Sequence, residues 1–144
     1  MIAAIADTHT TIWYLFSDPR LGSGASAFID EAASKGEHVG VSAITIVEIV
    51  YLMEKGRIPS SALADLRRAI LDEAAVLRCV ALDERIAMKM MEVPREAVPD
   101  LPDRVIAATA FAARRSYPEP GPSNSGIGAP NDLVAGRLPV VHVL

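Results

Sequence analysis

The chain has 144 residues, of which 51% are hydrophobic and 22% are charged, so it can form one domain with a substantial core. A net charge of −4 argues against a wholly basic nucleic-acid binder, and charges, prolines or glycines interrupt each apolar run before it reaches membrane-spanning length. The single cysteine, Cys79, excludes an internal disulfide, and the amino terminus lacks the basic region of a signal peptide. We therefore expect a cytoplasmic protein with no membrane association.

Strands and helices are predicted in alternation along the chain. Short apolar runs indicate buried strands, and apolar residues three or four positions apart indicate helices. In chain order we expect a strand at 2–6, a helix at 8–18, a helix at 24–36, a strand at 37–42, a helix that ends near Gly56, a helix at 60–74, a strand at 75–82, a helix at 83–93, a helix that begins at or just after Asp103, and a last strand at 138–144.

This alternation predicts an α/β fold with a mostly parallel sheet covered on both faces. We expect one domain over residues 1–144. Residues 118–131 hold four prolines and three glycines, so this segment is expected to be an irregular loop within an otherwise regular pattern.

Asp7 follows the first predicted strand directly. In open α/β sheets, ligands bind just outside the carboxyl ends of the strands, so this position suits a functional acid. A carboxylate there can equally cap the following helix by accepting from its first backbone N–H groups. The two roles are compatible with each other.

Glu48 stands inside the segment VSAITIVEIVYLM, which is otherwise almost entirely apolar. Burying an ionised carboxylate costs several kcal/mol unless another group compensates its charge. One explanation is a carboxylate that reaches the rim of the core or pairs with a distant arginine. The other is a bound metal ion, which would supply the missing positive charge.

Asp100 and Asp103 lie three residues apart where the late alanine-rich helix begins. Acids are favoured in the first turn of a helix, and Asp103 is at the position expected for a cap. Asp100 precedes Pro102 and is expected in the loop, either supporting a site or exposed to solvent.

Asp7, Glu48 and Asp103 are far apart in the sequence, and only the fold can bring them together. Three carboxylates at close range repel one another, which raises their pKa values or requires a cation. Oxygen donors suit Mg²⁺ or Mn²⁺. One cysteine and three scattered histidines do not form a zinc site.

The blocks IADTHTTIWYL, VSAITIVEIVYLMEKGRI and LPDRVIAATA, in this order, resemble PIN domains. Within that superfamily they resemble the ribonuclease toxins of VapBC toxin–antitoxin systems. The resemblance covers most of residues 1 to 115 and the final strand. It implies a three-layer α/β/α fold with a mostly parallel central sheet.

The resemblance also implies a function and a set of site residues. Asp7, Glu48 and Asp103 would hold Mg²⁺, with Mn²⁺ as a plausible substitute, and would catalyse hydrolysis of RNA phosphodiester bonds. Thr8 and Asp100 match supporting positions. The implied partners are an RNA substrate, a small antitoxin protein and a second copy of the chain.

The sequence departs from the family pattern in one place. A fourth acid is usual after the late helix, and Asn124 falls nearest to its position. An amide offers an oxygen but no charge, so an alternative is a degenerate PIN domain that binds RNA or a protein without catalysis. A phosphoryl-transfer protein with Asp7 as nucleophile is disfavoured, because His9 replaces the second aspartate that phosphatases of the haloacid dehalogenase type need.

Overall fold

The structure is a computed structural model that describes residues 1–113 and 140–141. The loop expected at 118–131, which includes Asn124, lies outside the described residues. The single-domain expectation for residues 1–144 therefore stays a prediction.

The sheet has four described strands, all parallel, in the order β3-β2-β1-β4. Their bounds are β1 Ile2–Ala6, β2 His38–Ser42, β3 Leu77–Val80 and β4 Val140–Val141. Ala6 of β1 lies opposite Val41 of β2 and Val141 of β4. The chain segments that follow β1 and β2 therefore leave the sheet at the same edge, which is the carboxyl edge where ligands bind in such folds.

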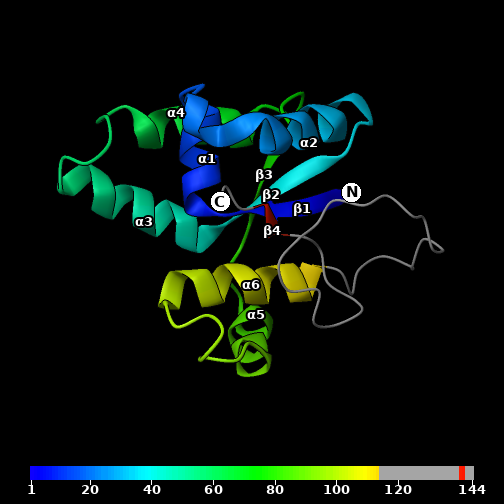
Figure 1. Cartoon of the computed structure of the whole chain (residues 1–144), viewed down its shortest axis with the longest axis vertical. Coiled ribbons are helices and arrows are strands. Elements are labelled where there is room, and N and C mark those ends of the chain that lie inside the picture. Colours follow the sequence, from blue (N-terminus) through cyan, green and yellow to red (C-terminus); the bar gives the residue numbers. More distant parts are fainter. Residues whose placement is uncertain (114–139, 142–144) are drawn as a thin grey trace.

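Six described helices cover the sheet, and Figure 1 shows α1, α2 and α4 on one face with α5 and α6 on the other. Their bounds are α1 Thr8–Leu15, α2 Gly22–Ser34, α3 Ala43–Glu54, α4 Ala62–Leu71, α5 Glu84–Lys89 and α6 Leu101–Ala113, with 3₁₀ turns η1 Pro19–Leu21 and η2 Met90–Glu92. The predicted three-layer α/β/α fold is confirmed. None of the helices in the described ranges is both long and apolar enough to cross a membrane.

The two faces of the sheet build separate cores, because successive side chains of a strand point to opposite faces. Val39 and Val41 of β2 join the larger cluster with Ile49 of α3, whereas Ile5 of β1 packs against Ile106 of α6. Strands buried on both faces read as nearly continuous apolar runs, which is why β1 is recognisable in the sequence.

Gly40 in the middle of β2 makes room for the packing on the face of the sheet that α6 covers. A Cβ atom at this position would lie 2.6 Å from Cδ1 of Ile5 and 3.1 Å from Cγ2 of Val80. Both distances are shorter than ordinary carbon–carbon contacts. The missing side chain thus lets Ile5 fill the space between β2 and α6.

Candidate functional site

Asp7 lies at the carboxyl end of β1 and is the N-cap of α1. Its Oδ1 accepts a hydrogen bond from the backbone N–H of Thr10 at 2.7 Å, and its own N–H donates to the carbonyl of Val141 at 3.3 Å. The capping role predicted for Asp7 is confirmed. These bonds fix the carboxylate at the edge of the sheet where a functional acid was expected.

Glu48 is on the second turn of α3 and is held by the first residue of α1. The buried hydroxyl of Thr8 donates to Oε1 of Glu48 at 2.5 Å, and the same hydroxyl oxygen lies 3.2 Å from Oγ1 of Thr45. Thr8 thus supports Glu48, although it is adjacent to Asp7 in the sequence.

The position of Glu48 in α3 agrees with a carboxylate at the rim of the core. Val47 and Tyr51 are 60% and 54% exposed, whereas Thr45 and Ile49 are completely buried. Glu48 falls between these faces and is half-buried at the rim of the core. Among the described residues it forms no salt bridge, so the alternative of a distant arginine partner is not supported within these ranges.

The surroundings of Glu48 raise its pKa above the usual value of 4.5. Burial is the largest cause, and the negative charges of Asp103 and Asp100 act in the same direction. The hydrogen bond from Thr8 and the nearby His9 lower the pKa. The fold therefore brings Glu48 into electrostatic contact with two acids more than fifty residues away in the sequence.

Helix α6 begins at Leu101, two residues earlier than expected. The carbonyl of Asp100 accepts from the backbone N–H of Arg104 at 3.0 Å, so Asp100 precedes the helix and Asp103 lies inside its first turn. The expectation that Asp103 is at the cap position was wrong. Proline is well tolerated in a first turn because its missing N–H would have no partner there, and Pro102 is accordingly the second residue of the helix rather than a barrier to it.

Both aspartates of this segment are exposed. Helix α6 packs against α3, and Figure 1 shows the amino-terminal end of α6 on the side of the sheet from which α3 extends. This packing, between helices far apart in the sequence, is what places Asp100 and Asp103 near Glu48.

The donor chemistry of this site fits a hard divalent cation. Carboxylate oxygens are the ligands that Mg²⁺ prefers. Burial and, to a smaller extent, the charges of Asp103 and Asp100 raise the pKa of Glu48, and a bound cation would offset both effects. Within residues 1–113 and 140–141, however, no three His, Cys, Asp or Glu side chains are close enough to form a metal-binding group. Mg²⁺ commonly uses one or two carboxylates and keeps several waters, so the smaller set can still serve it.

Two neighbours of Glu48 were not assigned to the site from the sequence. Thr45 precedes Glu48 by three positions, and this helical spacing could have indicated that the two side chains are neighbours. His9 follows Asp7 by two positions, but no sequence pattern connects it with α3. Only the packing of α1 against α3 brings it near Glu48.

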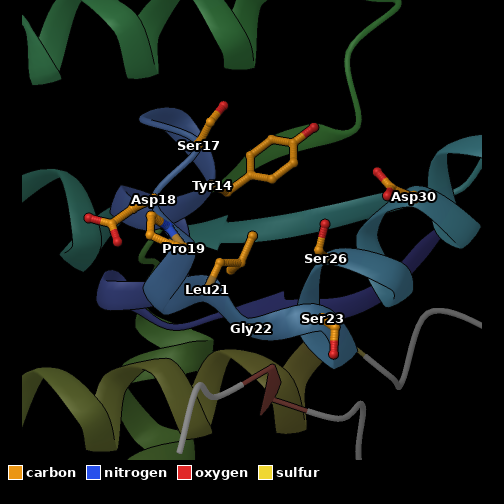
Figure 2. A pocket seen from close by; sticks show the side chains of 9 residues that line it. All are labelled: Tyr14, Ser17, Asp18, Pro19, Leu21, Gly22, Ser23, Ser26 and Asp30. Carbon is orange, nitrogen blue, oxygen red and sulfur yellow. The ribbon is translucent and has the colours of Figure 1, made fainter.

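A separate cleft lies between the end of α1 and the start of α2 (Figure 2). Its volume is about 450 Å³, and its lining includes Tyr14, Ser26 and Asp30. Burial raises the pKa of Tyr14, and the negative charge of Asp30 adds to this effect. The acids Asp7, Glu48, Asp100 and Asp103 do not line this cleft, so it is distinct from the site around Glu48.

The protein is a parallel three-layer α/β domain, and acids from separate segments of its chain lie near the carboxyl edge of the sheet, where ligands bind in such folds. The family model of the PIN domain matches residues 4–116, and the chain belongs to this family. Among curated proteins, none matches the sequence significantly.

Among solved structures, the fold is similar to the crystal structure of VapBC2 from Rickettsia felis bound to a DNA fragment from their promoter. The TM-score is 0.57, with 16% sequence identity, and the match covers 78% of this chain and 82% of that chain. At this level of identity the similarity concerns the fold.

Proposed function

We propose that the protein is a Mg²⁺-dependent endoribonuclease toxin of a toxin–antitoxin pair. Membership of the PIN domain family, whose members are generally nucleases, supports a nuclease, and the similarity to a VapBC2 complex supports the toxin–antitoxin context. The observation that carries the proposal is the carboxylate of Glu48, which is half-buried, held by Thr8 and close to the charges of Asp103 and Asp100.

In this proposal each acid has a position that its local structure explains. Asp7 is fixed by its bond to the N–H of Thr10, and Glu48 by the hydroxyl of Thr8. Asp103 projects from the first turn of α6, where the helix dipole favours negative charge. Asp100 adds charge from the preceding residue, and Asn124 is the candidate for a further oxygen donor from outside the described residues.

Asp7, Glu48 and Asp103 would be the ligands of Mg²⁺ or Mn²⁺, with one or two of them bound to the ion directly and the others through its waters. When bound, such an ion activates a water for attack on the RNA phosphodiester and offsets charge on the leaving oxygen. The chain's own part is positioning, because the hydrogen bonds to Asp7 and Glu48 orient their oxygens before any substrate binds.

The proposed partners, besides RNA, are a small antitoxin and a second copy of the chain. Exposed apolar side chains on α3 and α6, which include Val47, Tyr51 and Leu101, offer surface for such contacts. Light scattering of the antitoxin-free protein should give a mass near twice the 15.3 kDa of one chain. A mass of one chain at micromolar concentration would contradict the proposed homodimer.

The test of the function is cleavage of a total RNA pool by the purified, antitoxin-free protein. Fragments should form with Mg²⁺, fail to form with EDTA, and fail to form with Glu48→Gln. Glu54→Gln is the matched control, because Glu54 is an exposed glutamate at the end of the same helix. Equal cleavage by wild type and Glu48→Gln would overturn the proposal.

The alternative is a PIN domain that binds RNA or a protein without catalysis. It is favoured by the finding that the described residues contain no group of three acids within metal-binding distance. Calorimetric titration with Mn²⁺ separates the two, since the alternative predicts no heat of binding, whereas the nuclease predicts saturable binding that Glu48→Gln removes.

A further inference from the structure

The side chains of Thr45, Thr8 and Glu48 form a short chain of polar groups at the junction of α1 and α3. Thr45 Oγ1 lies 3.2 Å from Thr8 Oγ1, which lies 2.5 Å from Oε1 of Glu48. Thr45 is completely buried and Thr8 is 4% exposed. Two hydroxyl groups are thus removed from water at this junction and must satisfy each other or the carboxylate.

The number of hydrogens available fixes the direction of these bonds. A hydroxyl has one hydrogen to donate and two lone pairs to accept with, whereas an ionised carboxylate can only accept. Thr8 uses its hydrogen on Glu48, so it can only accept from Thr45. Thr45 must then be the donor of the bond between the two hydroxyls.

A second pair of buried hydroxyls differs from this one, because there the threonine donates its hydrogen to a backbone carbonyl and not to the other hydroxyl. Oγ of Ser42 lies 3.1 Å from Oγ1 of Thr109, but the hydroxyl of Thr109 donates to the carbonyl of Val105 at 2.7 Å. Thr45 makes no such bond to a backbone carbonyl within the described residues. Its hydrogen is therefore available for Thr8.

We propose that Thr45 is a positioning residue of the acidic site, because its hydroxyl donates to Thr8 and so directs the hydrogen of Thr8 onto Glu48. Thr45 acts through Thr8 and does not itself contact a substrate or a metal ion. Hydrogen bonds in such a chain polarise one another, so the bond from Thr8 to Glu48 is stronger when Thr45 is present. The inference rests on the hydrogen bonds, and its consequence for metal binding rests on the proposed function.

Unfolding experiments without metal test the hydrogen-bond chain itself. Thr45→Val removes the hydroxyl and keeps the shape of the side chain. It should lower the urea midpoint more when it is made in the wild type than when it is made in Glu48→Gln. The reason is that Thr8 donates to a charged carboxylate in the wild type and to a neutral amide oxygen in Glu48→Gln. Thr45→Ser keeps the hydroxyl and should retain most of this coupling. Thr109→Val, which alters the other pair, should lower both midpoints equally. An equal loss from Thr45→Val in both backgrounds would overturn the proposal.

Calorimetry with Mn²⁺ tests the consequence for the site. Loss of a residue that orients a metal ligand typically weakens affinity at least about tenfold, so Thr45→Val should bind Mn²⁺ on the order of tenfold more weakly. Thr45→Ser and Thr109→Val should bind nearly as wild type does. If wild type and Thr45→Val bind equally well, the positioning role is wrong. If wild type binds no Mn²⁺ and cleaves no RNA, the proposed function fails, and the unfolding experiments still decide the hydrogen-bond chain.

Discussion

Two acids of this molecule have opposite electrostatic surroundings. Asp18, before η1, is bound by Arg20 at 2.6 Å, and the hydrogen bond from this arginine is the largest cause of its lowered pKa. Glu48 forms no salt bridge with the described residues, and burial together with Asp103 and Asp100 raises its pKa. One carboxylate has a cation built into the fold, while the other has more acids nearby.

This difference separates an acid that serves structure from an acid suited to function. Arg20 also lies over the ring of Trp13, with 5.2 Å between the guanidinium carbon and the ring centroid, so it contacts both Asp18 and α1. The surroundings of Glu48 oppose its charge in the absence of a cation. Such an arrangement is typical of sites where a ligand supplies the compensation.

The largest expected effect is the response of each acid's variant to metal. Mn²⁺ at a hundred times its dissociation constant should stabilise the wild type by about 2.7 kcal/mol, because it binds the folded state alone. Glu48→Gln should abolish this gain, and Asp18→Asn should retain it. Thermal unfolding with Mn²⁺ and with EDTA measures the effect.

The same measurement can break the comparison. If Asp18→Asn and Glu48→Gln respond equally to Mn²⁺, the ion binds elsewhere, and the opposite surroundings of the two acids have no bearing on metal binding. Ca²⁺ or Mg²⁺ in place of Mn²⁺ would then help to locate the binding groups by their preference for coordination geometry.

An effect of intermediate size is expected in the pH dependence of stability without metal. Because the pKa of Glu48 is higher in the folded state than in the unfolded state, the wild type loses stability as pH rises through the folded-state value. Glu48→Gln cannot ionise and should therefore be the more stable protein at pH 7 to 8. Near pH 4 and below, where Glu48 is largely protonated in both states, the two should converge.

Urea unfolding from pH 4 to pH 8 in EDTA measures this difference. Thr8 can donate to an amide oxygen as it does to a carboxylate, so Glu48→Gln keeps that contact and changes mainly the charge. A variant less stable than the wild type at pH 8 would show that Glu48 is compensated by a group outside the described residues.

Much of the fold was predictable because local patterns specify it. The strand β1 is a continuous apolar run, β2 has an apolar centre, and Gly56 lies just beyond the end of α3. The start of α6 was misplaced, since the prediction weighed Asp103 as a cap more heavily than Pro102 as a first-turn residue. Boundaries depend on such competing local preferences and are the least reliable part of a sequence prediction.

The candidate site was predictable only in part, because it depends on packing between distant helices. An acid after a strand and an acid in an apolar segment are visible in the sequence, so Asp7 and Glu48 could be selected. The contact between Thr8 and Glu48 spans forty residues and follows from how α1 lies against α3. No local pattern carries that information. The spacing of Thr45 and Glu48 could have shown that these two are neighbours, but not that Thr45 contacts Thr8 of another helix.

The smallest expected effect is that of Asp18→Asn on stability, and its pH dependence should have the opposite sign. The lowered pKa of Asp18 means that its contribution is present above the unfolded-state pKa and is lost as pH falls through the folded-state value. Asparagine can still accept from the backbone N–H of Arg20, so only the exposed ion pair is lost, and solvent screens such pairs strongly.

Urea unfolding of Asp18→Asn at pH 7 and at pH 2.5 checks this sign, with 0.5 M NaCl as a further condition. We expect a slight loss of stability at pH 7 that shrinks in acid and in high salt. A loss that grows on acidification would contradict the assignment of Asp18 to the Arg20 pair. If Asp18→Asn loses more stability at pH 7 than Glu48→Gln gains, the ion pair of Asp18 contributes more to the free energy of unfolding than the charge of Glu48 does.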